Sequence, residues 1–251
     1  MIKKIYRSEL DLYNLSLKKT TNTKNQKYFD YKNIVVNKPW GYEYLMFENK
    51  EVAIWILHIN YDFLTSMHCH PKKRTSLFLL DGRATITTLD SQFNLGYPEG
   101  LMIDSGVFHS TKATSPEGIF LMEIETPPDK NDLVRLKDKY GRENKGYEGK
   151  TEMSNKLHQY EYCSFNDIKE IMTKKIVHDK IKKRTIQIKQ NKSFDSFYKH
   201  IKELRSGIFS ILDKKIEHNK EVIYPGDIID LQNAHKYNKI KLSNFISLII
   251  Y

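Results

Sequence analysis

Short segments rich in β-branched and aromatic residues, separated by turn-forming residues, constrain the fold of this chain most strongly. The clearest of them span residues 52–59, 76–80, 83–89, 101–103 and 118–125. The first is almost entirely apolar and is bounded by charged residues, which indicates a strand buried on both faces. The dipeptide Asp81-Gly82 predicts a hairpin between the second and third segments. Strands this short and this frequent predict an all-β sandwich or small barrel.

The length and charge of the chain limit its class further. With 251 residues it can form one large β domain or two smaller ones with separate cores. Its formal net charge is +10, with 22 basic and 19 acidic residues in 1–150, and 19 basic and 12 acidic residues in 151–251. Most of the excess is lysine, and the arginines are scattered, so we expect no nucleic-acid partner. Attraction of anionic small molecules is the weaker alternative.

Location is predicted from what the sequence lacks. No apolar run approaches the ~20 residues of a membrane-spanning helix. The N-terminal basic residues are not followed by the apolar segment of a secretory signal. Cys69 and Cys163 lie far apart in the sequence and form neither a disulfide framework nor a paired-cysteine metal motif. We therefore expect a cytoplasmic protein without disulfide bonds.

Three histidines carry the strongest chemical signal. On a strand, His68 and His70 point to the same face, because side chains alternate with a period of two. His109 lies beyond the predicted hairpin and is expected on a neighbouring strand. Three imidazoles placed in this way can occupy three positions around a divalent metal. A hydrogen-bonded or surface pair is the alternative for His68 and His70 taken alone.

An internal repeat relates the two halves of the chain. His109 lies nine residues after Gly100, and His235 lies nine residues after Gly226. Upstream, residues 74–81 and 205–213 each run from an arginine through an apolar stretch to an aspartate. The shared order predicts a duplication. The second copy lacks the His-x-His pair, so we expect it to be degenerate and to serve packing or dimerisation.

The connecting segments complete the predicted organisation. Polar residues 16–26 predict a loop within an N-terminal extension, residues 1–33. Residues 164–181 have helix-like apolar spacing, including Ile176, after Ser164 as a candidate N-cap. They predict a short helical linker. The expected domains are therefore 34–150, with the histidines, and 151–251, with the linker and the degenerate copy.

These motifs resemble those of the cupin superfamily. His68-x-His70, the strand ending at Gly82, and His109 after Asp104-Ser-Gly106 are similar to its two histidine motifs. Two flanking segments, Lys38-Pro-Trp-Gly-Tyr-Glu43 and residues 133–142, resemble the cupin domain of type II phosphomannose isomerases and mannose-1-phosphate guanylyltransferases. The resemblance covers about residues 34–145. It implies a jelly-roll β-barrel, a divalent metal in the barrel mouth and sugar-phosphate chemistry. With the repeat, it predicts a bicupin whose C-terminal barrel is degenerate.

The chain departs from the cupin pattern at one metal ligand. The glutamate expected three or four residues after His70 is replaced by Arg74 or Thr75. Three histidines alone can still bind zinc, iron, nickel or manganese, with water in the open positions. Glu123 or Glu125 can substitute for the missing ligand if their shared face points inward. The alternative is a metal-free cavity in which Lys72 and Arg74 bind an anion.

The resemblance and the histidines together predict a function. We expect a metal-dependent sugar-phosphate or nucleotide-sugar isomerase or epimerase in bacterial surface-polysaccharide (capsule or lipopolysaccharide) synthesis, and a homodimer. A non-catalytic sugar-binding cupin and a three-histidine non-haem iron oxygenase are the alternatives. The predicted site consists of the metal ligands His68, His70 and His109, the candidate bases Glu123 and Glu125, and the phosphate-binding residues Lys72, Arg74, Arg135 and Arg142.

Overall fold

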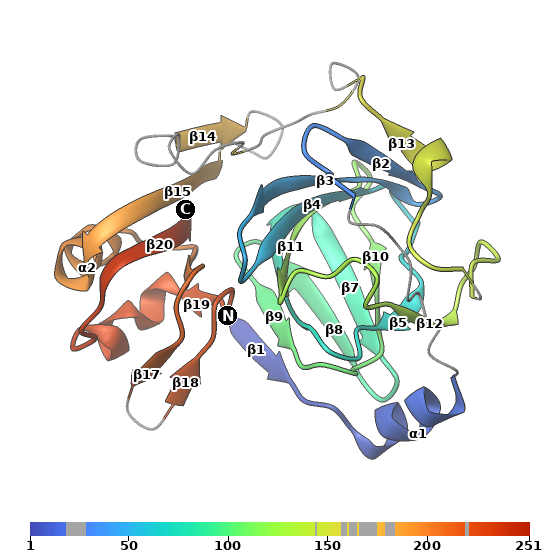
Figure 1. Cartoon of the computed structure of the whole chain (residues 1–251), viewed down its shortest axis with the longest axis horizontal. Coiled ribbons are helices and arrows are strands. Elements are labelled where there is room, and N and C mark those ends of the chain that lie inside the picture. The colour runs from blue at the N-terminus through green and yellow to red at the C-terminus, as the bar shows by residue number, and fades with distance from the viewer. Residues whose placement is uncertain are drawn as a thin grey trace.

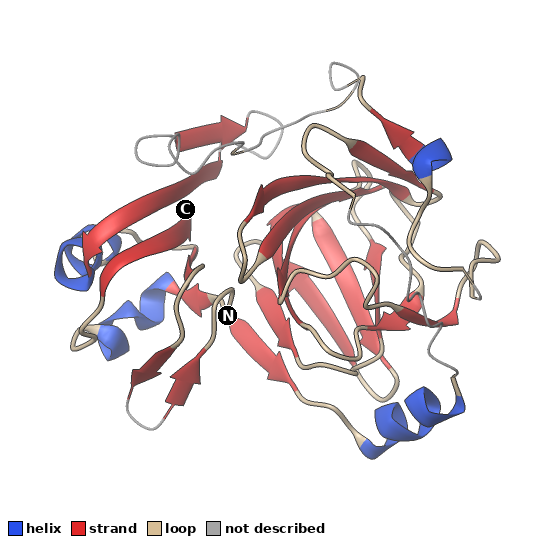
Figure 2. Ribbon diagram, in the orientation of Figure 1, coloured by secondary structure: helices blue, strands red, loops and turns tan. Residues whose placement is uncertain are grey.

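The computed structural model describes most of the chain. The described residues are 1–18, 29–143, 145–156, 160, 165, 184–218 and 221–251, together with the backbone of 175–178. Two sheets face each other in the N-terminal part, and a third sheet lies beside them (Figures 1 and 2). No helix among these residues has the length and apolar character needed to cross a membrane.

The N-terminal part is a jelly-roll barrel of two sheets. The larger sheet has, in spatial order, β1 (Ile2–Ile5), β9 (Gly100–Ile103), β6 (Arg74–Asp81), β11 (Ile119–Thr126), β4 (Ala53–Ile59), β3 (Gly41–Glu48), β2 (Val35–Lys38) and β13 (Met153–Ser154). The smaller sheet has β12 (Val134–Lys137), β5 (Met67–Cys69), β10 (His109–Ala113), β7 (Arg83–Thr88) and β8 (Gln92–Gly96). The predicted all-β fold is therefore confirmed, and each of the five segments read from the sequence contains a strand.

At Asp81-Gly82 the chain crosses from the larger sheet to the smaller one and forms a corner between them. The predicted hairpin is therefore wrong. β6 pairs with β9 and β11 in the larger sheet, whereas β7 pairs with β8 and β10 in the smaller one. Gly82 has a φ of +84°, and a Cβ there would meet the Gly118 carbonyl oxygen at 2.6 Å. A hairpin turn and a corner between two sheets both favour glycine at this position. Only the distant strands with which β6 and β7 pair distinguish the two.

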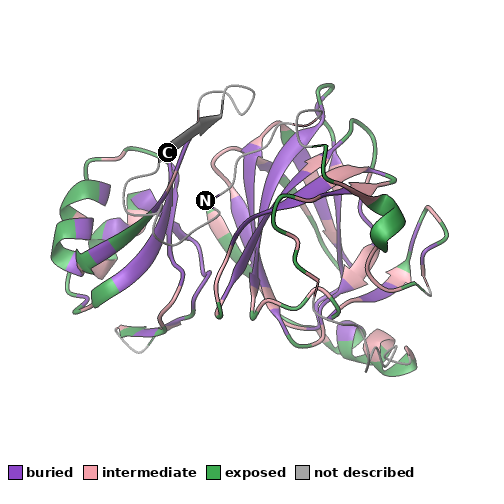
Figure 3. Ribbon diagram, turned by 45° about the horizontal axis from the view of Figure 1, so that its top comes forward, coloured by how far each residue is buried: buried purple, intermediate pink, exposed green. Residues whose placement is uncertain are grey.

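The larger sheet is buried on both faces, as the apolar run at 52–59 predicts. Along β4, Trp55 and Leu57 face the barrel interior, whereas Ile54 and Ile56 pack on the outside against the third sheet. The third sheet supplies Ile188 and Leu248 to that outer core. Figure 3 shows the buried residues concentrated in the strands where the larger sheet and the third sheet face each other. One core therefore joins the two halves of the chain.

The third sheet repeats the strand order of the barrel. It consists of β14 (Lys175–His178), β15 (Arg184–Ser193), β20 (Ser243–Ile250), β16 (Ile208–Ile211) and β19 (Ile229–Asp230). This is the order of β3, β4, β11, β6 and β9 in the larger sheet. In chain order, a hairpin of β17 (Ile216–His218) and β18 (Glu221–Ile223) lies between β16 and β19, as β7 and β8 lie between β6 and β9. The arrangement is consistent with the predicted degenerate second cupin.

Two helices cover the face of the third sheet that points away from the barrel. They are α2 (Phe194–Ile201) and the 3-10 helix η4 (Leu231–Tyr237), which pack through Phe194, Phe197 and Leu231. His200 lies on α2 and His235 on η4, and both are exposed. The second copy therefore places these two histidines on helices at the surface, away from any shared site.

Two sequence predictions about connecting segments need correction. The polar loop predicted at 16–26 is wrong at its start, because Ser16 and Leu17 belong to α1 (Glu9–Leu17). The helix predicted over 164–181 is wrong at Ile176, which lies in strand β14 and pairs with β15. Phe165 is buried, and its N–H donates to the Met46 carbonyl oxygen at 2.8 Å. The rest of the predicted linker helix lies outside the described residues.

The N-terminal extension is a packed part of the barrel. β1 pairs in parallel with β9, from Ile2 opposite Gly100 to Ile5 opposite Ile103. α1 begins with a capping box, in which the Ser8 hydroxyl accepts from the Asp11 N–H while the Asp11 carboxylate accepts from the Ser8 N–H. Residues 1–18 are thus continuous with the fold that carries the histidines.

Candidate metal centre

The structure brings the three predicted histidines together in the barrel. His68 lies on β5 directly opposite His109 on β10, and His70 follows β5. Their ring centroids are 4.6 Å apart for His68 and His109, 5.0 Å for His68 and His70, and 5.7 Å for His70 and His109. One nitrogen from each ring lies within 4.8 Å of the other two, which is a spacing that suits a shared metal ion.

Each imidazole is oriented by a hydrogen bond from its Nδ1 to a backbone carbonyl. His68 Nδ1 lies 2.8 Å from the Ser66 oxygen, and His109 Nδ1 lies 3.0 Å from the Val107 oxygen. His70 Nδ1 lies 2.6 Å from the Asp132 oxygen, which comes from a distant loop. A carbonyl can only accept, so these contacts place the proton on Nδ1 and leave each Nε2 lone pair free.

The protonation state of the cluster also suits a metal. Burial, reinforced by the neighbouring His70, lowers the pKa of His109 to about 4. Burial and the charges of the other two histidines likewise lower the pKa of His68 well below its usual value. Both rings are therefore neutral at pH 7, which metal ligation requires. Burial raises the pKa of the intervening Cys69 thiol to about 12, so Cys69 is a packing residue.

Glu123, one of the two glutamates expected to substitute for the missing ligand, lies beside His70. It lies on β11, on the same inward face as Leu121, with Oε1 3.6 Å from His70 Nε2. Burial raises the pKa of Glu123, but His70, Lys130 and Lys73 outweigh this and hold it below its usual value. His70 Nε2 is buried without a hydrogen-bond partner, and 3.6 Å exceeds hydrogen-bond distance. Three imidazoles and one carboxylate therefore fit a divalent metal.

Glu125 also faces the barrel interior but has different neighbours. Its Oε1 accepts from Lys73 Nζ at 2.8 Å and from Lys130 Nζ at 3.0 Å. Its Oε2 is buried and has no hydrogen-bond partner. One carboxylate oxygen is thus fixed by two ammonium groups while the other is available for proton transfer.

Lys72 and Arg74 do not reach the histidines. The Lys72 side chain is exposed, and its backbone N–H donates to Asp132 at 2.9 Å. Arg74 contacts Asp104 and Asp227, both at 3.2 Å, and stacks on Tyr224 in the second half of the chain. The buried cation of this segment is Lys73, at 1% exposure. Neither Lys72 nor Arg74 lines the cavity that contains the histidines, so we do not assign them a role in binding phosphate.

Arg135 and Arg142 line the cavity that contains the histidines, and their terminal Nη groups are bonded within the protein. Arg142 Nη1 lies 2.6 Å from Glu148, and its Nη2 lies 2.8 Å from Asp138. Arg135 Nη1 donates to the carbonyl oxygens of residues 145 and 146, both at 2.6 Å, and Nη2 lies 3.4 Å from Glu148. Both guanidiniums therefore hold the chain around the cavity.

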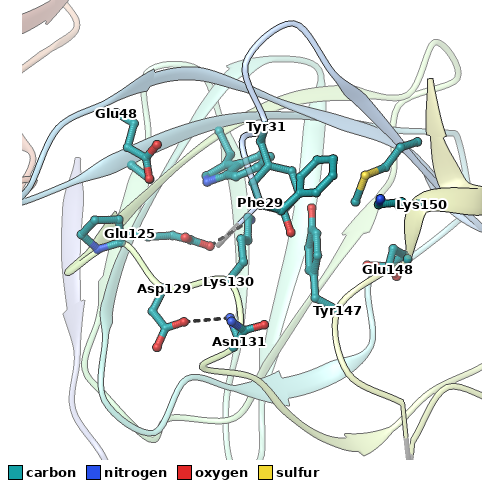
Figure 4. Close-up of a pocket in the computed structure, with 15 residues that line it drawn as sticks. Phe29, Tyr31, Glu48, Glu125, Asp129, Lys130, Asn131, Tyr147, Glu148 and Lys150 are labelled. Atoms are coloured by element: carbon teal, nitrogen blue, oxygen red, sulfur yellow. Dashed lines mark hydrogen bonds and ion pairs between the residues drawn. The ribbon is translucent and has the colours of Figure 1, made fainter. Parts of the chain in front are cut away.

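Two adjoining cavities lead to the histidines. The inner one, of about 60 Å³, is lined by His68, His70 and Glu123 among others. The outer one, of about 360 Å³, is lined by aromatic and acidic residues (Figure 4). Glu125, Lys130 and Tyr147 line both cavities and form the partition between them. Figure 4 shows Lys130 between Glu125 and Tyr147, and its Nζ lies 3.6 Å from the centre of the Trp55 ring.

Several charged and aromatic residues that line the two cavities were not predicted from the sequence. The missed residues are Lys38, Glu43, Lys130, Tyr147 and Glu148. Lys38 and Glu43 are the first and last residues of the segment that carries the family resemblance. The sequence therefore contained a motif that could have identified them. Lys130 lies between β11 and β12, and Tyr147 and Glu148 lie between β12 and β13. These connecting segments have no periodic pattern, and only the fold brings the three residues inward.

Asp11 of the N-terminal helix supports the metal centre from outside. Its Oδ1 accepts from the Phe108 N–H at 2.9 Å, and Phe108 immediately precedes His109. Its Oδ2 accepts from the Ser8 N–H and hydroxyl at 2.9 and 2.8 Å. Asp11 is only 3% exposed. The helix thus fixes the backbone that presents His109.

Asp11→Ala is therefore expected to weaken metal binding by about tenfold, in the range seen for outer-shell substitutions. Competition with a chelating dye measures the dissociation constant for Zn²⁺, and Co²⁺ absorption reports the ligand geometry. Glu9→Ala, at an exposed position in the same helical turn, is the matched control. A variant that melts earlier but keeps the wild-type affinity and spectrum would reduce α1 to a packing element.

Comparisons with known proteins found no family for this chain and only distant structural likenesses. No family model matches the chain, and no curated protein is significantly similar to it. Among solved structures, KdgF from Halomonas sp. is 8% identical, with a TM-score of 0.33, over 44% of this chain and 94% of that one.

Two further structures are similar in the same way. An RmlC-like cupin from Shewanella frigidimarina is 13% identical, with a TM-score of 0.35, over 42% of this chain and 95% of that one. The capsular polysaccharide assembling protein CapF from Staphylococcus aureus is 12% identical, with a TM-score of 0.36, over 41% of this chain and only 34% of that one. At these identities and TM-scores the likeness assigns the chain neither a family nor a role.

Proposed function

We propose that this protein is a metal-dependent cupin enzyme that isomerises or epimerises a carbohydrate. The observation that carries the proposal is the set of three imidazoles with Nδ1 held by carbonyls and Nε2 free, completed by Glu123. A divalent metal bound there would act as a Lewis acid on the carbonyl and hydroxyl groups of a sugar.

The residues of the chain supply the proton transfer. Glu125 lies at the partition between the cavities, where Lys73 and Lys130 hold it by Oε1. Its free Oε2 accepts a proton from a carbon next to the substrate carbonyl and returns it to the neighbouring carbon or to the opposite face. Burial lowers the pKa of Lys130, but Glu125, Glu43 and Glu123 outweigh this and raise it above its usual value, so Lys130 stays cationic throughout.

Glu125→Gln tests this role with little change in shape. We expect its kcat to fall by about 10²–10⁴-fold, the usual contribution of a positioned base, while metal content stays near one ion per chain. Turnover is followed by proton–deuterium exchange at the substrate carbon in D₂O, which needs no knowledge of the product. Unchanged exchange in Glu125→Gln would assign the base elsewhere.

Metal analysis of the purified protein tests the proposal as a whole. Bound metal together with solvent exchange into a sugar substrate supports the isomerase. Bound metal and sugar without exchange would instead support the non-catalytic sugar-binding module, and no metal would refute both the isomerase and the iron oxygenase. The role in surface-polysaccharide synthesis, the homodimer and the cytoplasmic location stay predictions.

A further inference from the structure

The cations around the inner cavity already have carboxylate partners within the protein. These cations are Lys38, Lys73, Lys130, Arg135 and Arg142, with side chains between 1% and 11% exposed. Their partners are Glu43, Glu125, Asp138 and Glu148. Five cations thus face these four carboxylates and Glu123, so the site holds equal numbers of both charges.

A phosphate group would have to break one of these pairs. The guanidinium of Arg142 is already used by Asp138 and Glu148, so the two parallel N–H groups that phosphate prefers are occupied. Displacing either acid would leave a buried, unpaired carboxylate, which is strongly unfavourable. Arg135 Nε is buried without a partner and offers a single N–H group. A neutral hydroxyl group can accept from it without any exchange, whereas it does not provide the two parallel N–H groups that phosphate prefers.

The outer cavity is also poorly suited to an anion. Its wall contains the aromatic rings of Phe29, Tyr31, Trp55 and Tyr147. Its charged lining residues are Glu48, Glu125, Asp129 and Glu148 against Lys130 and Lys150. Like charges repel a phosphate, whereas carboxylates accept hydrogen bonds from hydroxyl groups and aromatic faces pack on apolar C–H surfaces.

The two lysines of the outer cavity do not reverse this balance. Lys130 Nζ lies 3.0 Å from Glu125 Oε1 and 3.3 Å from Glu43 Oε1, and it also lies over the Trp55 ring. Lys150 lies exposed at the rim, where a single lysine attracts an anion only weakly. The cavity volume of about 360 Å³ is in the range of small-molecule sites, which usually hold about 300–1,000 Å³.

We infer that the outer cavity selects an uncharged polyhydroxylated ring over the phosphorylated form of the same sugar. The inference rests on the proposed function, because it names the substrate class of that site. It differs from the phosphate binding expected from the family resemblance. The selecting feature is the engagement of Arg135 and Arg142 by Glu148.

The test compares matched sugars on the full chain loaded with Co²⁺. The probes are D-glucose, D-galactose and D-mannose, each with its 6-phosphate, and binding is read from the Co²⁺ absorption and by calorimetry. We expect at least one hexose to bind at least tenfold more tightly than its phosphate. A phosphate ester that binds as tightly as its parent, or no binding by any of the six, overturns the inference.

Two variants identify the cause of the preference. Glu148→Gln removes the carboxylate that both guanidiniums share, while Arg142 keeps Asp138. It is expected to reduce the preference for the neutral sugar by at least tenfold. Glu48→Gln removes a carboxylate from the same cavity and is expected to leave most of the preference intact. Equal effects of the two variants would contradict the role of the arginine pairs.

The failure of this inference is distinguishable from failure of the proposed function. A chain that binds no Co²⁺ refutes the proposed function before any sugar is added. A Co²⁺-loaded chain that binds a hexose phosphate more tightly, and exchanges its carbon-bound proton, refutes only the inference.

Discussion

Replacing His109 with alanine is expected to remove the bound divalent metal. His109 faces His68 across the paired strands and supplies one of the three clustered imidazoles, so its loss leaves two imidazoles and a carboxylate. The loss of affinity should exceed the about 10–100-fold effect of an outer-shell substitution. Elemental analysis after dialysis, and a Zn²⁺-dependent rise in the melting temperature, measure the effect.

The second half of the chain provides the matched control. His235 stands at the same distance after Gly226 as His109 does after Gly100, but it is exposed on η4 and bonded to the Gln232 carbonyl at 3.1 Å. His235→Ala should keep the wild-type metal content and melting shift. Retention of one metal ion per chain by His109→Ala would place the metal elsewhere and refute the site.

Glu125→Leu is expected to cause the largest loss of stability among the site variants. Lys73 is 1% exposed, and without Glu125 its ammonium keeps only the Asp129 carbonyl at 2.8 Å. A buried charge that loses its partner typically costs about 3–5 kcal/mol of unfolding free energy. Urea unfolding should show this as a lower midpoint with an unchanged slope.

The double variant separates the buried charge from the lost packing. Lys73→Met with Glu125→Leu removes both members of the pair, while Lys130 keeps Glu43 at 3.3 Å. We expect it to recover more than half of the stability lost in Glu125→Leu, because apolar replacements of a buried pair are often tolerated. A double variant as unstable as Glu125→Leu would show that shape, and not charge, is decisive there.

The sequence predicted correctly those features that depend only on residues close together in the chain. A period of two placed His68 and His70 on one face, and the continuous apolar run at 52–59 predicted a strand covered on both sides. Both features depend on neighbouring residues alone. The same is true of Glu123 and Glu125, whose shared face follows from strand alternation once Leu121 is buried.

The remaining features depend on partners far away in the chain. Arg74 is tied to Asp227 and Tyr224 of the second half, and no local pattern indicates that contact. Lys73, and not Lys72, turns inward because the loop that carries Asp129 closes over it. The corner at Gly82 and the strand at Ile176 likewise reflect distant pairing that overrides local turn and helix signals.

The core shared by the larger sheet and the third sheet couples the unfolding of the two halves of the chain. β4 and β11 carry Trp55 and Glu123 on one face and present Ile54 and Ile124 to Leu248 and its neighbours on the other. Melting of the C-terminal sheet would therefore expose the back of the strands that line both cavities. The metal-bearing half and its eroded copy should behave as a single cooperative unit, with one transition for both.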